Sequence, residues 1–192
     1  MRSNDWVRAS LEAASDVFQK TAAACRNEIE QAAQAVVAAL RHGDKVFLCG
    51  NGGSAADAQH FATEMTVKMN RFRSPMAAIA LTTNSSLLTA QANDLGFETV
   101  FSRQLESLGR PGDILVAIST SGMSPNIVSA VACARSMGIK VIGLTGCGGG
   151  RVAAMSDIAI TVPSDEVPRI QEAHIAICHL MCEFAETTLY GR

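Results

Sequence analysis

The chain has 192 residues and a formal net charge of −2, and its charged residues form no long run of one sign. This length suits one domain with a sizeable core, and the charge balance argues against nucleic acid as a partner. No stretch reaches the about 18 consecutive apolar residues of a membrane span, and residues 1–8 lack the apolar core of a signal peptide. We therefore expect a cytoplasmic protein that contacts no membrane.

Apolar spacing predicts alternating helices and strands along the chain. Two helices are expected over 5–41. Further helices are expected over 54–69, 85–93, 97–109, 125–137 and 168–189, and strands over 45–49, 76–81, 113–118, 140–145 and 157–162. Short, continuously apolar strands between helices indicate a parallel sheet buried on both faces.

The predicted fold is therefore α/β, a three-layer sandwich with a five-stranded parallel sheet preceded by N-terminal helices. We expect one domain over 1–192, with a helical arm over 1–43 and an α/β core over 44–192. The two N-terminal helices have no obvious place on a closed five-stranded sandwich. We therefore expect them to pack against another copy in an oligomer.

A glycine loop follows the first predicted strand, with the sequence Gly-Asn-Gly-Gly-Ser-Ala over 50–55. It satisfies G-x-G-x-x-G/A, but the second strand is followed by no carboxylate that could hold a ribose. The lysine of a nucleoside triphosphate loop is also missing. NAD and ATP are therefore disfavoured. A tight turn without a ligand and a site for a smaller anionic or polar ligand both remain open.

A second loop follows the strand at 113–118 and carries four hydroxyl groups around one glycine. They belong to Ser119, Thr120, Ser121 and Ser124. One hydroxyl is enough to cap the next helix, so four exceed that need. Short donors and backbone amides at a helix N-terminus suit a phosphate group, and both loops lie where open parallel sheets bind ligands.

Ionisable side chains cluster in two of the predicted helices. His60 and Glu64 are four residues apart and share one helix face, with Asp57 three residues earlier on the same side. The closing helix carries Gln171 and His179. Taken alone, these residues could be a solvated His–Glu pair and a histidine satisfied within the core.

Several motifs together resemble the SIS (sugar isomerase) family, and within it the phosphoheptose isomerases. They are GNGGSAADAQHFATE, the Ser-Thr-Ser-Gly-x-Ser loop, Ala92-Asn93-Asp94 and Arg169-Ile-Gln171-Glu…His179. The resemblance implies conversion of sedoheptulose 7-phosphate to D-glycero-D-manno-heptose 7-phosphate, the first step of activated-heptose biosynthesis for lipopolysaccharide or related glycans. It also implies a homotetramer with intersubunit active sites and one Zn²⁺ per subunit.

The resemblance also implies roles for individual residues. Glu64 would be the base that moves a proton between C1 and C2, and His179 its acid/base partner. The zinc ligands would be His60, Glu64, Gln171 and His179. Sugar contacts would come from Asn51, Gly52, Gly53, Ser54, Asp57, Asn93, Asp94 and Gln171, and phosphate contacts from Ser119, Thr120, Ser121 and Ser124.

The spacing of two of these ligands adds an expectation about the oligomer. Gln171 and His179 are eight residues apart, which on a straight helix is about 12 Å along the axis. Two ligands of one zinc lie only about 3–3.5 Å apart. We therefore expect one of the two to come from a neighbouring subunit.

Other functions share parts of this pattern. Non-catalytic SIS relatives that bind the bacterial replication initiator lack the glutamate and the histidine found here at Glu64 and His179. Isomerases of amino-sugar or pentose phosphates would need the same loops but not the four-ligand set. A sugar-phosphate-sensing regulator would carry a DNA-binding segment, which residues 1–45 do not resemble. Lys68 departs from the family by replacing a more usual arginine.

Overall fold

The computed structural model describes residues 5–191. Two helices open the chain, as predicted, over Trp6–Ala24 (α1) and Arg26–His42 (α2). Gly43 ends α2 in a left-handed conformation with φ of 85°, and its N–H donates to the carbonyls of the last turn. The chain then enters the first strand directly.

The five predicted strands form one parallel sheet in the order β2-β1-β3-β4-β5. Their bounds are Val46–Gly50 (β1), Ala78–Ala80 (β2), Ile114–Ser119 (β3), Lys140–Thr145 (β4) and Ile158–Thr161 (β5). The strand order reverses between β1 and β3, where Gly50 is paired with Ile118. Open parallel sheets bind ligands outside the carboxyl ends of the strands at such a point.

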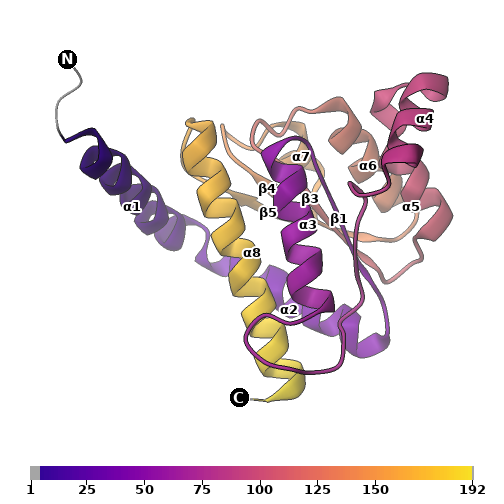
Figure 1. Cartoon of the computed structure of the whole chain (residues 1–192), viewed down its shortest axis with the longest axis horizontal. Helices are drawn as coiled ribbons and strands as arrows, with labels where there is room; N and C mark the ends of the chain where they lie inside the picture. The colour runs from indigo at the N-terminus through magenta and orange to yellow at the C-terminus, as the bar shows by residue number, and fades with distance from the viewer. Residues whose placement is uncertain (1–4, 192) are drawn as a thin grey trace.

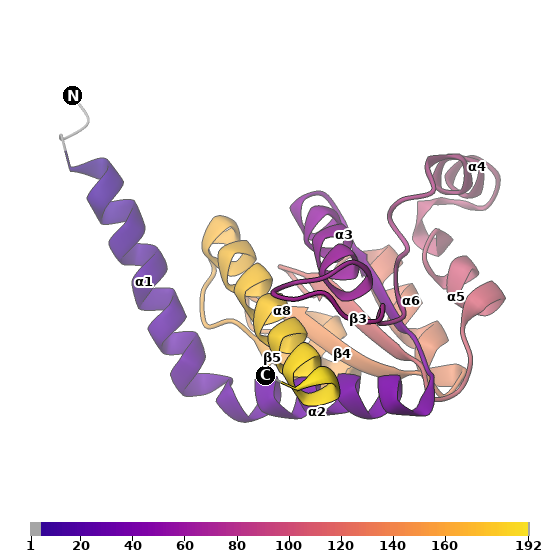
Figure 2. The ribbon, with the colours of Figure 1, turned by 60° about the horizontal axis from the view of Figure 1, so that its bottom comes forward.

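Helices cover both faces of the sheet, so the predicted three-layer architecture is confirmed (Figures 1 and 2). One face is covered by α2, α3 (Gly53–Thr66) and α8 (Val167–Tyr190). The other is covered by α5 (Ser102–Leu108), α6 (Pro125–Ser136) and α7 (Gly150–Met155). A short end piece, α4 (Ser85–Leu95) with the 3₁₀ turn η1 (Phe97–Thr99), lies at the far end of the molecule from α8.

Three local predictions were wrong in detail. The helix expected over 54–69 ends at Thr66, and residues 67–77 form an irregular connection to a second strand of only three residues. The helix expected over 97–109 is divided into η1 and α5. Helix α7 was not predicted, because six residues that start at a glycine are too few to establish a helical period.

The expectation that both N-terminal helices lie outside the sandwich was wrong for α2. Its residues Val36 and Val37 are buried in the core beneath the sheet. Helix α1 instead extends beyond the layered body (Figure 2) and exposes large apolar side chains, including Leu11 and Phe18. Arg169 at the start of α8 holds it by donating to the Ser10 carbonyl at 2.7 Å. No helix within residues 5–191 combines the length and apolar character needed to cross a bilayer.

A buried histidine on α8 makes the fold sensitive to acid. Nε2 of His174 donates to the Thr145 carbonyl at 3.1 Å, and Nδ1 is buried with no partner among the described residues. Burial lowers the pKa of His174 to about 4, against the opposing effect of that hydrogen bond. In the unfolded chain His174 is protonated near pH 6.5, whereas in the folded chain it is protonated only near pH 4. The free energy of unfolding therefore decreases as pH falls from 6.5 toward 4.

We expect His174 to remove about 2 kcal/mol of unfolding free energy between pH 7 and pH 5. Urea unfolding of wild type and His174→Gln at both pH values measures this. The variant should lose markedly less stability on acidification than wild type. His42→Gln, at an exposed histidine of α2, is the control and should behave like wild type. Equal pH dependence of wild type and His174→Gln would contradict the prediction.

Candidate active site

The glycine loop turns the chain sharply from β1 into α3. A Cβ on Gly50 would lie 2.4 Å from the carbonyl oxygen of Ser54, so this position requires glycine. Gly52 precedes the helix with φ of 55° and ψ of −121°. The N–H groups that open a helix lack partners within it, and α3 begins at Gly53, three residues after the carboxyl end of β1. They can bind an anion or a polar ligand there.

The hydroxyl loop lies at the end of the neighbouring strand β3. Ser119 Oγ donates to Ser124 Oγ at 3.3 Å, and Ser121 Oγ accepts from the N–H of Met123 at 3.2 Å. The N–H of Gly122 donates to the Ser119 carbonyl at 3.0 Å and closes the turn. The hydroxyl residues therefore lie in the turn that leads into α6, and their predicted contact with a phosphate group stays a prediction.

A pair of asparagines joins the two loops. Asn51 Nδ2 donates to Asn126 Oδ1 at 2.9 Å, and Asn126 Nδ2 donates back to Asn51 Oδ1 at 2.8 Å. Asn126 is buried on α6, and its Oδ1 also accepts from the N–H of Ile127. Asn126 was not predicted as a site residue from the sequence. Its only signal is a polar side chain at a buried position just after the hydroxyl loop.

Helices α3 and α8 bring three of the predicted chemical groups together. Nε2 of His60 lies 2.9 Å from Nε2 of His179, and 3.4 Å from Oε1 of Glu64. The two imidazole rings meet edge to face with centroids 5.1 Å apart. His60 is about half exposed and Glu64 is 20% exposed, so the cluster faces an open surface of the chain.

Asp57 lies one helical turn before His60 on α3. Its Oδ2 is buried without a partner among the described residues. Burial raises the pKa of the Asp57 carboxyl, and the nearby imidazoles of His60 and His179 act in the opposite direction. A buried carboxylate oxygen without a partner among the described residues therefore lies between the glycine loop and the histidine pair, and the predicted contact of Asp57 with substrate stays a prediction.

Gln171 lies apart from this cluster. A Cβ on Gly53 would be 2.5 Å from its side-chain nitrogen, so the Gln171 amide rests on the first turn of α3. His60 is seven residues farther along the same helix, about 10 Å along its axis. Within one chain, Gln171 therefore lies next to the glycine loop, while His179 lies next to His60 and Glu64.

The donor set suits zinc in kind and in pair spacing. Two imidazole nitrogens and a carboxylate oxygen are usual zinc ligands, and ligand atoms on one tetrahedral zinc lie about 3.4 Å apart. Both short contacts run through His60, however. Across residues 5–191, no three His, Cys, Asp or Glu side chains form a group that could hold a metal ion unaided. The zinc site predicted from the sequence is therefore not formed by the described residues of one chain, and the metal stays a prediction.

Comparison with known proteins places this geometry in a family. Residues 11–146 match the SIS domain. A phosphoheptose isomerase of Rhodospirillum rubrum is 51% identical over 96% of this chain and 98% of its own length. The chain belongs to the SIS domain family, and within it to the phosphoheptose isomerases.

Solved structures of this family superpose on nearly the whole chain. A phosphoheptose isomerase from Francisella tularensis is 41% identical, with a TM-score of 0.93 over 97% of this chain and all of that one. A phosphoheptose isomerase from Neisseria gonorrhoeae is 44% identical, with a TM-score of 0.89 over 94% of this chain and 97% of that one. The predictions of family, fold class and an isomerase enzyme are therefore confirmed.

Other predicted residues of this SIS domain lie away from the cluster within one chain. Asn93 and Asp94 are exposed on α4, where Asn93 Nδ2 donates to Asp94 Oδ1 at 2.8 Å. Helix α4 lies at one end of the molecule, well away from α8 (Figure 1). Their predicted contact with sugar stays a prediction.

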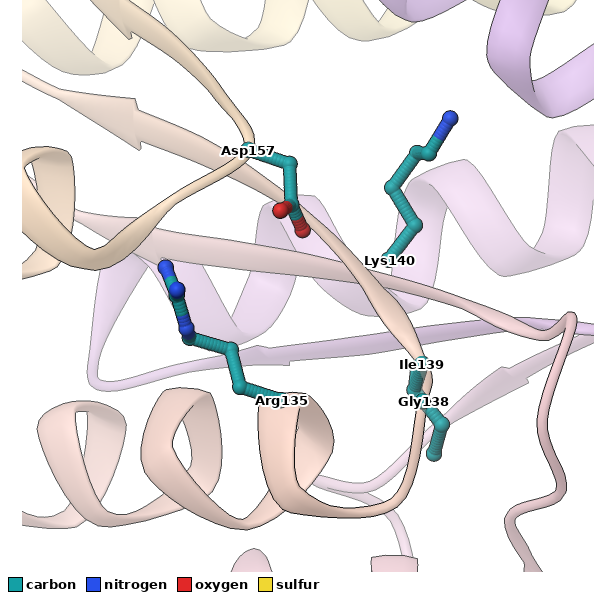
Figure 3. A pocket seen from close by; sticks show the side chains of 5 residues that line it. All are labelled: Arg135, Gly138, Ile139, Lys140 and Asp157. Carbon is teal, nitrogen blue, oxygen red and sulfur yellow. The ribbon is translucent and has the colours of Figure 1, made fainter.

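A cavity of about 280 Å³ lies at the opposite edge of the sheet, where β4 begins (Figure 3). Asp157, Arg135 and Lys140 line it, and the Lys140 side chain points away from the other two. Asp157 accepts from the N–H of Val141 at 2.7 Å, and Arg135 donates to the Met155 carbonyl. These charges serve backbone groups of the fold, so this cavity does not compete with the histidine cluster as the active site.

Proposed function

We propose that this chain is a zinc-dependent isomerase that converts sedoheptulose 7-phosphate to D-glycero-D-manno-heptose 7-phosphate, in the first step of activated-heptose biosynthesis. One observation supports it above all. Glu64 and His179 come from two helices far apart in sequence, α3 and α8, and meet at His60, on the helix that begins at the glycine loop.

The reaction needs a base at carbon and an acid/base at oxygen. The Glu64 carboxylate takes the proton from one of C1 and C2 and returns it to the other, through an enediol. His179 moves the proton between the two sugar oxygens. The hydroxyls of Ser119, Thr120, Ser121 and Ser124 hold the phosphate, and Asn51 and the first turn of α3 contact sugar hydroxyls.

Zinc would be held by His60, Glu64 and His179 of one chain, with Gln171 of a neighbouring copy as the fourth ligand. The metal would polarise the carbonyl and stabilise negative charge on the enediolate oxygen. Gln171 rests against Gly53 in its own chain, about 10 Å from His60 along α3, which supports a ligand from outside.

This arrangement requires an oligomer, and we propose a homotetramer with active sites between subunits. An apolar hollow of about 630 Å³ lies between α1, α2 and α8. One of its lining residues, Leu180, directly follows His179 in the sequence. The hollow is lined by exposed Leu180 and Phe184 together with Ile29. Helix α1 also exposes large apolar side chains, including Leu11 and Phe18, and exposed apolar surfaces commonly mark protein interfaces.

We also propose that the enzyme works in the cytoplasm. All six cysteines are free, and four of them are buried. Free buried thiols suit a reducing compartment, whereas small secreted domains use their cysteines in disulfides.

An isomerisation assay with metal removal tests the function. Purified enzyme should convert sedoheptulose 7-phosphate to the heptose phosphate. Treatment with a chelator should lower the rate by at least about 10-fold, and added Zn²⁺ should restore it. Metal analysis of the untreated enzyme should find one zinc per subunit. A fully active chelated enzyme would remove zinc from the proposal.

The same assay separates the competing functions. Activity only on an amino-sugar or pentose phosphate would assign the chain to another isomerase of the same fold. Absence of activity on all of these sugar phosphates, with zinc present and the chain folded, would support a binding role such as that of relatives that contact the replication initiator.

A further inference from the structure

The connection from α3 to β2 contains a buried ion pair with α8. Nε of Arg73 lies 3.2 Å from Oε1 of Glu186, and each side chain is only 2% exposed. Removing two charges from water is costly unless further hydrogen bonds satisfy both groups. The contacts of this pair therefore indicate what it holds in place.

The Glu186 carboxylate binds the first part of the connection between α3 and β2. Oε1 accepts from the N–H of Met69 at 3.3 Å, and Oε2 accepts from the N–H of Asn70 at 3.0 Å. The segment that follows α3 is thereby fastened to α8.

The Arg73 guanidinium turns back to the end of α3. Nη2 donates to the carbonyl of Glu64, and Nη1 donates to the carbonyl of Met65, both at 2.7 Å. The last four carbonyls of a helix lack partners within it, and a cation there is favoured by the helix dipole. Arg73 thus caps α3 at the residue that carries the carboxylate of the histidine cluster.

These contacts link the two chemical groups of the site through the protein's interior. The Glu64 backbone is bound by Arg73, Arg73 is bound by Glu186, and Glu186 lies on α8 seven residues after His179. Residues seven apart lie on nearly the same face of a helix. The link therefore runs parallel to the contact between His60 and His179.

We propose that Arg73 and Glu186 are positioning residues for the isomerase: they lock the end of α3 to α8 and thereby set the spacing between the Glu64 carboxylate and the His179 imidazole. The inference rests on the proposed function. Neither residue touches the reacting atoms. Misplacing a catalytic group by about 1 Å can cost about 100-fold in rate, so a lock of this kind has a measurable effect on turnover.

Glu186→Gln is the principal variant, because it keeps the shape of the side chain and removes its charge. We expect kcat on sedoheptulose 7-phosphate to fall about 10- to 100-fold, with KM changed less than about 3-fold. The KM should hold because the glycine and hydroxyl loops lie at the other end of α3. A merely structural role would lower the melting temperature and leave kcat of the folded enzyme unchanged.

Asp113→Asn is the matched control. Asp113 is also a buried carboxylate, and it accepts from the N–H groups of Lys45 and Arg110, both at 2.8 Å. It lies at the opposite edge of the sheet from the histidine cluster. We expect this variant to have a lower melting temperature than wild type but the same kcat. Equal kcat in wild type and Glu186→Gln, with melting temperatures lowered alike in both variants, would overturn the proposal.

Arg73→Lys provides a second, milder variant that keeps the charge. A single ammonium cannot reach Glu186 and two carbonyls together as a guanidinium does. We expect a kcat loss in the same direction as that of Glu186→Gln. Full activity of Arg73→Lys would contradict the lock.

Imidazole NMR separates failure of the lock from failure of the proposed function. The chain has four histidines, so ¹H–¹⁵N spectra of their rings are simple. In Glu186→Gln, the signals of His60 and His179 should shift, while those of His42 and His174 should stay. Unmoved signals of His60 and His179 would overturn the lock. An inactive wild type with shifted signals would overturn only the isomerase.

Discussion

Glu64→Gln is expected to lower turnover of sedoheptulose 7-phosphate by about 10²- to 10⁴-fold, the range typical of a lost general base. The amide has the shape of the carboxylate but cannot accept the proton from carbon. Glu64 is one-fifth exposed on α3 and contacts His60, so the substitution leaves the core untouched. Steady-state kinetics and a thermal melt of the same preparation measure both expectations.

Glu106→Gln is the matched control for this prediction. Glu106 is an exposed carboxylate on α5 that pairs with Arg103, three residues earlier on the same helix. It should retain the turnover and melting temperature of wild type. If Glu64→Gln turns over like Glu106→Gln, Glu64 has no part in the chemistry.

Gly122→Ala is expected to destabilise the chain by more than about 4 kcal/mol, or to prevent folding. Gly122 has φ of 63° in the hydroxyl loop, and a Cβ there would lie 1.9 Å from the carbonyl oxygen of Gly149. Its own carbonyl accepts from the N–H of Val152 on α7 at 2.9 Å. Two backbone segments would have to separate, and the hydroxyl loop would move with them.

Gly148→Ala isolates the cost of backbone conformation. Gly148 has φ of 77°, but an added Cβ would meet nothing within 4 Å. We expect a loss of only about 1 kcal/mol, with the affinity for the sugar phosphate unchanged. Denaturant unfolding compares the two variants. Similar losses of unfolding free energy would show that the clash between a Cβ at position 122 and the Gly149 carbonyl does not destabilise the fold.

The sequence predicted the architecture because its strands are short apolar runs with helices between them. Each of the five expected strands is present in the parallel sheet. Helix ends were harder to predict. Thr66 ends α3 because Arg73, nine residues beyond Glu64 in the chain, caps it from a segment without regular structure. No local pattern indicates a cap of this kind.

The motifs predicted the chemical residues but not their spatial grouping. Spacing of four residues places His60 beside Glu64, and only the packing of α3 on α8 brings His179 to them. Asn126 and Glu186 were not predicted as functional. Neither has a local sequence pattern that marks it, because the role of each depends on a partner far along the chain.

The two N-terminal helices have similar sequence patterns but are buried to different extents. Both helices are rich in alanine and apolar at helical spacing, yet α2 buries much of one face in the core whereas α1 buries only Val17 and Thr21. The choice depends on the area that the sheet and α8 leave open. This area is set by tertiary packing and has no counterpart in the periodicity of either helix.

The two outermost strands of the sheet are its shortest, with three residues in β2 and four in β5. Brief borders of this kind offer few free backbone groups to a strand of another molecule, which protects the protein from fibrous aggregation. The proposed homotetramer would then have to form through helical surfaces, because the sheet borders are too short to pair. The side of the chain where His60 and His179 are exposed is one of these surfaces, so short border strands agree with the proposed active sites between subunits.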